Sequence, residues 1–197
     1  MRPLDVSEIL NIADYELARE SLRPKIMALK ERRRVSLGPH LTVLFENRDT
    51  VRYQIQEMMR IERIVKPGDI VHEVKTYNEL LPDPGELSGC LFIEYETVEE
   101  SRTKLTELLG LENHVWLHVG DLPPSRVRFD LRQASPGRIS AVQYIRIPLT
   151  PAQMEQWLEA GQAGKIRLIV DHPNYSYQQS LTAAQAQEVF PDFQGIE

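Results

Sequence analysis

The sequence has little cysteine, no long apolar run and no excess of positive charge. Its single cysteine, Cys90, excludes an intrachain disulfide and a thiolate zinc site. No stretch approaches the roughly 20 apolar residues that span a membrane, and the first residues lack the apolar segment of a signal peptide. The 23 basic and 29 acidic residues give a net charge of −6, so neither nucleic acid nor an anionic membrane is an expected partner. These absences predict a cytoplasmic protein.

Familiar catalytic motifs are missing as well. The chain has no glycine-rich phosphate loop of the dinucleotide-binding or nucleoside-triphosphatase type, and no serine lies in a Gly-x-Ser-x-Gly elbow. What is present is the composition of a globular protein, with 42% hydrophobic and 26% charged residues in a chain of 197. A chain of this length buries enough surface to fold without disulfides or metals.

Hydrophobic periodicity and turn signals predict an α+β fold. We expect a helical N-terminal segment packed on a mostly antiparallel sheet of about six strands with interspersed helices. The chain is predicted to form a single domain over 1–197, helix-rich in 1–82 and strand-rich in 83–197. Proline- and glycine-containing turns separate several of the strands, which favours antiparallel neighbours.

The predicted elements begin with a helix over 7–34. Pro24 lacks an N–H and clashes with the preceding turn, so a kink or a break is expected near Leu22, with a second helix running to about Arg34. The segment 171–180 is expected to be a loop. The other expected elements are strands over 41–46, 89–95, 115–119, 126–131, 139–147 and 165–171, and helices over 48–65, 69–81, 98–109, 150–160 and from Thr182.

One acidic residue stands out in the helix expected over 48–65. Glu62 falls near the middle of an apolar face that also includes Gln54, whereas Glu57 points away from it. A carboxylate on a core face is costly unless it is paired, protonated or bound to a metal. Glu62 either lies at the last turn, where it reaches solvent or pairs with an arginine, or it faces an internal pocket as a ligand or acid–base group. The apolar face is formed by Val51, Ile55, Met58, Met59, Ile61 and Val65.

Two histidines lie where a strand meets a loop, a common location of functional sites. These are His40 and His172, and Asp171 is a candidate to orient the His172 ring, although adjacent strand residues usually point apart. The residues around them are equally typical of turns. Another pair, His114 and His118, is expected about 13 Å apart on one face of a strand, which is too far for one metal ion.

Two further features have both a structural and a functional interpretation. The basic run Arg32–Arg34 is typical of a solvated helix C-terminus, with phosphate or partner binding as the alternative. Cys90 begins an apolar run and is expected to be a core thiol, because a reactive thiolate needs a nearby cation.

Six segments form a specific pattern when they are taken together: Arg33–His40, Leu41–Glu46, Tyr53–Ile64, Tyr77–Pro82, Ile93–Tyr95 and Asp171–Pro173. Over nearly the whole chain, this pattern resembles an uncharacterised bacterial family catalogued only as a domain of unknown function, DUF3501. The resemblance implies no activity. It implies a role in redox or peroxide metabolism, because members are often encoded beside rubrerythrin-like diiron proteins and iron–sulfur oxidoreductases.

The resemblance also singles out candidate binding residues without assigning them roles. These are His40, Glu57, Glu62 and His172. One position departs from the family, since Gln143 stands where members often have histidine. If that histidine is a ligand in the relatives, this chain lacks it.

Three functions remain open at this point. The first is a non-enzymatic accessory protein that binds a rubrerythrin-like or iron–sulfur redox partner through an exposed apolar patch and has no pocket. The second is a protein, enzyme or not, that binds a small ligand or a metal such as iron, manganese or zinc through Glu62, His40 and His172, with Glu57 as a further candidate. The third is a homodimeric structural domain in which a buried Glu62 only pairs with an arginine.

Overall fold

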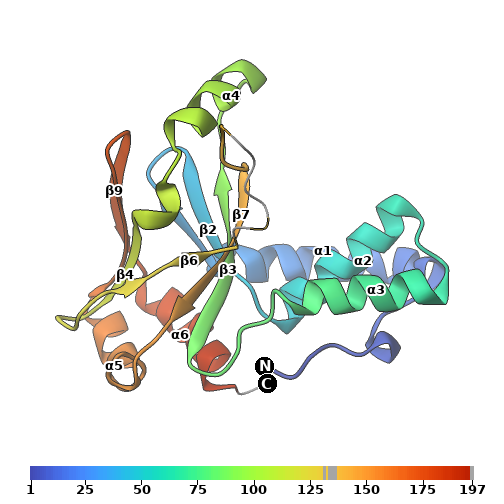
Figure 1. The fold of residues 1–197 in the computed structure, drawn as a ribbon. Coiled ribbons are helices and arrows are strands. Elements are labelled where there is room, and N and C mark those ends of the chain that lie inside the picture. Colours follow the sequence, from blue (N-terminus) through green and yellow to red (C-terminus); the bar gives the residue numbers. More distant parts are fainter. Residues whose placement is uncertain (131, 133–136, 196–197) are drawn as a thin grey trace.

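The computed structural model describes residues 1–130, 132 and 137–195. It has the predicted α+β fold, in which a helical arm projects from a body built of two sheets (Figure 1). None of the described helices is long and apolar enough to cross a membrane.

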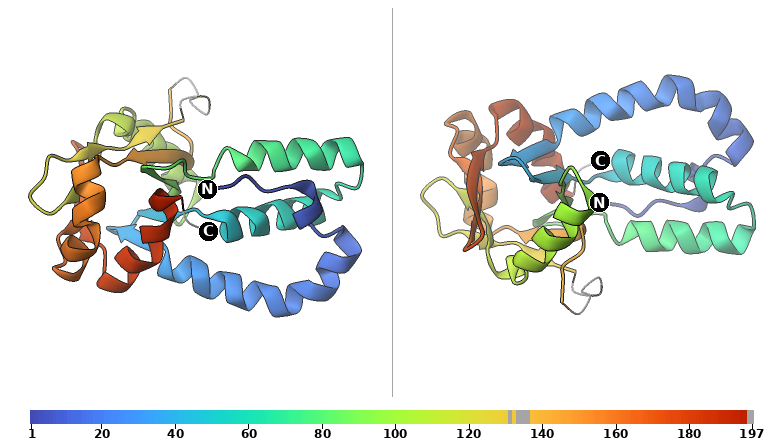
Figure 2. Two further views of the ribbon diagram at one scale, coloured as in Figure 1. Left: turned by 90° about the horizontal axis from the view of Figure 1, so that it is seen from below. Right: turned by 90° about the horizontal axis from the view of Figure 1, so that it is seen from above.

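The arm contains one short 3-10 helix and three α-helices: η1 (Val6–Glu8), α1 (Ile12–Arg32), α2 (Arg48–Glu62) and α3 (Pro67–Asn78). The three α-helices lie side by side, with α2 in contact with both α1 and α3 (Figure 2). Side-chain oxygens of Asn11 and Asn47 accept backbone N–H bonds at the starts of α1 and α2. Pro67 begins α3, where a missing N–H costs nothing.

The body contains two sheets whose described neighbouring strands are antiparallel. The first sheet is formed, in spatial order, by β1 (Arg34–Leu37), β2 (Leu41–Phe45), β3 (Glu86–Ile93), β7 (Val142–Pro148) and β6 (Arg128–Phe129). The second is formed by β5 (Ser125–Arg126), β4 (Val115–Val119), β8 (Ile166–His172) and β9 (Tyr175–Ser180). The sheets approach each other at both edges, because β1 contacts β9 and β5 contacts β7.

The main apolar core lies between the two sheets. Buried and half-buried residues alternate along β4, as expected for a strand with one face in the core. Two helices, α5 (Pro151–Gln162) and α6 (Ala183–Gln194), pack on each other and cover one end of the body (Figure 1). Trp157 of α5 donates its indole N–H to a backbone carbonyl of α6. The opposite end carries α4 (Val98–Glu107) and the 3-10 helix η2 (Leu111–Asn113).

A second, smaller apolar cluster belongs to the arm. Val51, Ile55 and Met59 recur every four residues on α2 and are buried together. Tyr144 of β7 packs against this cluster from the outer face of the first sheet. The sheet therefore separates the two clusters, and arm and body meet on its outer face. The remaining members of the second cluster are Leu4, Val74, Leu80 and Leu81.

Of the two outcomes expected near Leu22, a kink or a break, the break is wrong. Helix α1 continues through Pro24 to Arg32 and curves along the arm (Figure 2). Contacts with α2 hold it on both sides of the proline: Arg19 pairs with Glu57, and the Lys30 ammonium lies 5.2 Å from the centre of the Tyr53 ring. These contacts offset the hydrogen bond that the proline removes.

Two strands were not predicted. Residues 34–37 form β1, and Gly38, with φ of +74°, makes the turn to β2 instead of ending a helix. The expected loop over 171–180 contains the end of β8 and the whole of β9, which pair in a tight hairpin. The strand expected over 126–131 is two short strands, and Leu131 at its end lies outside the described residues.

Candidate functional site

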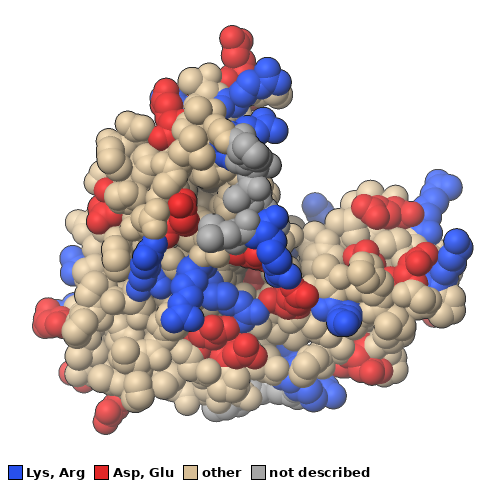
Figure 3. All heavy atoms as spheres, viewed as in Figure 1, with Lys and Arg blue, Asp and Glu red and all other residues tan. Residues whose placement is uncertain are grey.

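An open cleft of about 920 Å³ lies between the arm and the outer face of the first sheet. Acidic and basic side chains gather at this junction of arm and body (Figure 3). Its helical wall is formed by Met58, Glu62, Glu73, Thr76 and Tyr77. Its floor is formed by Ser88, Tyr144 and Arg146, and its rim by Arg128, Phe129 and Arg132.

Strand alternation determines which side chains form the floor. In β3 and β7, every second side chain enters the core of the body, and the side chains between them face the arm. The antiparallel register places Ser88 opposite Arg146 and Cys90 opposite Tyr144. The floor is therefore set by the pairing of residues that lie more than fifty positions apart in sequence.

Two arginines fix the cleft walls and are already paired. Arg146 donates to the backbone carbonyls of Leu81 and Glu79 and pairs with the Glu86 carboxylate. Arg132 binds the carboxylates of Asp130 and Glu79, each at 2.7 Å. Both guanidinium groups therefore connect the sheet to the residues that follow α3, and neither carries uncompensated charge.

Other polar groups in the cleft have no such partners. The Ser88 residue is only 2% exposed, and its hydroxyl makes no hydrogen bond with any described residue. Glu62 and Glu73 form no ion pair within the described part of the chain, although both lie near Tyr77. Burial raises the pKa of Tyr77, and these two carboxylates raise it further.

Glu62 does not lie on the core face that its helical position suggested. Helix α2 ends at Glu62, because Arg63 adopts the left-handed conformation with φ of 54°. Ile61 and Val65, which were assigned to the same apolar face, are 66% and 69% exposed. Glu62 is likewise exposed and lines the cleft. The structure therefore agrees with the first interpretation, in which Glu62 lies at the last turn of the helix and reaches solvent. Its carboxylate pairs with no arginine among the described residues.

Glu57 lies outside the cleft and joins two helices of the arm. Its carboxylate accepts hydrogen bonds from Arg19 at 2.7 and 3.1 Å and from the Tyr15 hydroxyl at 2.7 Å. The Arg19 guanidinium is the main reason that the pKa of Glu57 is lowered to about 2. This carboxylate has a clear structural role.

His40 and His172 lie in the body, away from both glutamates. His40 stacks on Tyr95 with ring centres 4.2 Å apart and lines a separate hollow of about 370 Å³. His172 is buried, and both ring nitrogens are used: Nε2 donates to the carbonyl of Leu109 at 3.1 Å, and Nδ1 accepts the N–H of Asn174 at 3.2 Å. No ring nitrogen of His172 remains for a metal ion.

Asp171 orients the ring of His114 and not that of the adjacent His172. Its carboxylate lies 3.0 Å from Nδ1 of His114, which precedes the neighbouring strand. Adjacent strand residues point to opposite faces, so Asp171 turns away from His172. His114 and His172 touch edge to face, with ring centres 5.1 Å apart.

The structure does not assemble the predicted metal site. The described residues contain no group of three or more His, Cys, Asp or Glu side chains that could hold a metal ion. Glu62 lines the cleft, while His40 lines the separate hollow. Gln143 faces the body core and donates to the carbonyl of Ser140 at 2.8 Å.

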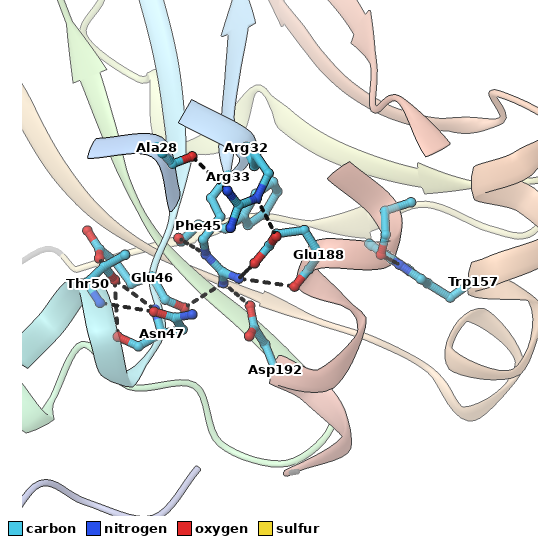
Figure 4. A network of polar contacts seen from close by, with 11 residues as sticks. Ala28, Arg32, Arg33, Phe45, Glu46, Asn47, Thr50, Trp157, Glu188 and Asp192 are labelled. Atoms are coloured by element: carbon cyan, nitrogen blue, oxygen red, sulfur yellow. Dashed lines mark hydrogen bonds and ion pairs between the residues drawn. The ribbon is translucent and has the colours of Figure 1, made fainter. Parts of the chain in front are cut away.

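The basic run at the end of α1 has a structural role that neither interpretation anticipated. Arg33 is 1% exposed and donates to the carbonyls of Phe45 and Glu188 at 2.9 and 3.2 Å (Figure 4). It also pairs with the buried carboxylate of Asp192.

Cys90 is a buried core thiol, as predicted, and burial raises its pKa, so it is a poor nucleophile.

Sequence reasoning missed most of the cleft. Ser88 and Tyr144 carry no local motif, and Tyr77 was noted only as the start of the segment Tyr77–Pro82. The three residues become neighbours only when the arm packs on the sheet. One signal was present in the alternation of β7, where Tyr144 and Arg146 occupy the face opposite to the core residues. Recognising that face as a floor requires knowing that α3 folds across it.

Comparisons with known proteins agree with this fold. The family described as "Protein of unknown function (DUF3501)" matches residues 3–193. The chain is also similar to a crystal structure of a novel protein of unknown function from Burkholderia pseudomallei K96243. The two share 33% identity and a TM-score of 0.86, over 97% of this chain and 99% of the other. No curated protein matches.

Proposed function

Because the chain belongs to the DUF3501 family, a family of unknown function, we propose its function from its own geometry. We propose a binding protein that holds a small organic molecule in the cleft between arm and body. The observation that carries this proposal is the cleft itself. Its volume of about 920 Å³ falls within the range of small-molecule sites, and it combines aromatic walls with a few polar groups.

The fixed geometry of the walls supports the proposal that the cleft is a preformed binding site. Arg146 ties the end of the arm to the sheet, so the cleft does not have to form when a ligand arrives. A preformed site loses less conformational entropy on binding. The Ser88 hydroxyl makes no hydrogen bond with a described residue and opens to the cleft, so it is available to a ligand.

A thermal-shift screen of small charged and neutral metabolites tests this proposal. We expect at least one compound to raise the melting temperature by several degrees at saturating concentration, because ligand binding stabilises the folded state. Thr76 is exposed on the helical wall, and Thr76→Trp should abolish the shift by filling the cleft. Thr103→Trp is the matched control, since Thr103 is exposed on α4 outside the cleft. A shift that survives Thr76→Trp, or no shift at all, would contradict the proposal.

The free end of the arm supports a second candidate, docking of a protein partner. Among the described residues, most of the exposed large apolar side chains lie on the elements that form this end. Such clustering is typical of interaction surfaces. The partner that the family context implies is a rubrerythrin-like or iron–sulfur redox protein. The side chains concerned are Val6, Leu10, Leu17, Ile61, Val65 and Val71.

Co-purification with such a redox protein tests the second candidate. Leu17 is 85% exposed, and Leu17→Glu should abolish capture by placing a charge on the apolar end of the arm. Val98→Glu is the matched control, because Val98 is 81% exposed on α4 at the body. Capture that is unchanged by Leu17→Glu, or absent from the wild-type chain, would count against this role.

A further inference from the structure

We propose that the ligand of the cleft is an organic cation, a compound that carries one or more amine groups on an aliphatic or aromatic frame. This inference rests on the proposed function and assigns its ligand class. It follows from three independent features of the cleft: its uncompensated charge, its aromatic rings and its unpaired hydroxyl.

The first feature is the charge that remains after internal pairing. Arg146 and Arg132 are neutralised by the carboxylates of Glu86, Asp130 and Glu79. On the helical wall, two further carboxylates stay without an ion pair in the described part of the chain, and both act on the same tyrosine. These are Glu62 and Glu73. An ammonium group beside Tyr77 would neutralise them.

Arg128 does not remove this preference. It lies exposed on the sheet side of the cleft, and it pairs with no acidic residue that the structure describes. The two unpaired carboxylates are on the opposite, helical wall. The helical wall is therefore the acidic side of the cleft, and a cationic group is favoured there.

The second feature is the aromatic lining beside these carboxylates. Tyr77 on the wall and Tyr144 on the floor interact with each other, and Phe129 lies on the rim. Aromatic faces attract ammonium groups through the ring quadrupole. Two carboxylates beside aromatic rings suit an organic ammonium better than a hydrated metal ion. The described residues also contain no cluster of side chains that could hold a metal ion.

The third feature is the Ser88 hydroxyl. It is almost wholly buried at the floor of the cleft and has no partner among the described residues. The hydroxyl oxygen is not among the fully buried polar atoms that lack a partner, so it opens to the cleft and is free to bond a group that enters it. A hydroxyl accepts a hydrogen bond readily, and an amine N–H is a suitable donor.

Isothermal titration of the full chain with three matched probes tests the inference. The probes are cadaverine, glutarate and 1,5-pentanediol, which share a five-carbon chain and differ in charge. We expect cadaverine alone to bind, with affinity that falls as salt is added. Glu62→Gln and Glu73→Gln should each weaken cadaverine binding about fivefold, the usual size of a partly exposed charge pair. Ser88→Ala should weaken it by a smaller factor.

Three controls make the result specific to the cleft. Thr76→Trp should abolish cadaverine binding, whereas Glu99→Gln removes an exposed carboxylate of α4 and should change nothing. Arg128→Ala should leave the affinity the same or slightly higher, because a like charge is removed. A weaker affinity in Arg128→Ala would show that the ligand needs an anionic group and would overturn the inference.

The other outcomes separate this inference from the proposed function. Glutarate binding that is lost in Thr76→Trp would keep the cleft as a binding site and overturn the cationic class. Cadaverine binding that is equal in Glu62→Gln, Glu73→Gln and wild type would overturn it as well. Binding by none of the three probes would reject the cationic class, and the thermal-shift screen would then decide on the cleft alone.

Discussion

At the scale of single residues, two buried or half-buried ion pairs hold the fold, and neither belongs to the cleft. Arg33 and Asp192 join the end of α1 to α6 inside the protein. Arg19 and Glu57 join α1 to α2. In both pairs, the loss of stability on removing one partner comes mainly from the charged group that is left behind. A charge left buried without its partner costs more than the intact pair contributes.

Removal of the Asp192 carboxylate should be strongly destabilising. Asp192→Ala leaves the buried Arg33 guanidinium with backbone carbonyls and with the Glu188 carboxylate at 3.7 Å as its one remaining counter-charge among the described residues, so the free energy of unfolding should fall by about 3 kcal/mol. Urea denaturation at pH 7.5 measures this, above the pKa of Asp192, which burial raises to about 6. Asp192→Asn keeps an acceptor and should cost less. Equal stability of Asp192→Ala and wild type would show that Arg33 is not held by this pair.

Glu57 should make stability depend on pH in the acidic range. Its pKa is lowered from 4.5 to about 2 in the folded protein, mainly by Arg19. The stabilisation is therefore fully present above pH 4.5 and is lost as the pH falls toward 2. Allowing for solvent screening, we expect Glu57→Gln to cost about 1–2 kcal/mol at pH 6 and less at pH 3. Denaturation at the two pH values measures the difference. Glu20→Gln is the control, because Glu20 is exposed on α1, the helix that carries Arg19, and forms no ion pair among the described residues. A Glu57→Gln deficit that grows at pH 3 would refute the assignment.

At the scale of elements, local signals predicted most helices and the central strands. Thr150 and Thr182 cap α5 and α6, where helices were expected to begin, because a capping side chain acts within one turn. The failures are at β1 and β9, where pairing partners decide the outcome. Five of the six residues in β9 are exposed or polar, so their sequence shows no alternation typical of a strand. They form a strand because they pair with β8 in a hairpin.

Pro24 shows how tertiary contacts override a local rule. The proline removes one hydrogen bond from α1, yet the helix stays continuous because α2 holds it on both sides. Pro24→Ala should therefore raise the free energy of unfolding, by about 1–3 kcal/mol, since the proline is exposed and makes no compensating contact. Chemical denaturation measures the gain, with the exposed Lys25→Ala as the control. A loss of stability in Pro24→Ala would indicate that the curvature of α1 at this point is required.

At the scale of the whole molecule, arm and body are linked at several places along the chain. Strand β2 leads directly into α2, and α1 leads into β1 through the buried Arg33. The single domain predicted for 1–197 should therefore unfold in one step. Trp116 and Trp157 both lie in the body, so their fluorescence reports on the body, while ellipticity at 222 nm reports largely on the helices. Coincident thermal transitions are expected, and an earlier loss of ellipticity would mean that the arm melts separately.

The candidate site could be predicted from sequence only in small part. Glu62 was identified as unusual, and it does line the cleft, although it is exposed rather than set among apolar neighbours. His40 and His172 were placed correctly at strand ends, but their strands do not bring them to Glu62. The site is formed by the packing of an arm on a sheet, and the distance in sequence between its walls leaves no local pattern.

The most direct test of the cleft as a ligand site is the ¹³C spectrum of the protein labelled at its methionine methyl groups. The chain has five methionines, and of these only Met58 lines the cleft. Assignment by Met58→Leu identifies its signal. On addition of cadaverine, the Met58 signal should shift until the site is saturated, while the signals of Met27 and Met154 should stay in place. A binding isotherm from titration with no movement of the Met58 signal would show that the ligand binds elsewhere, and the central claim would be wrong.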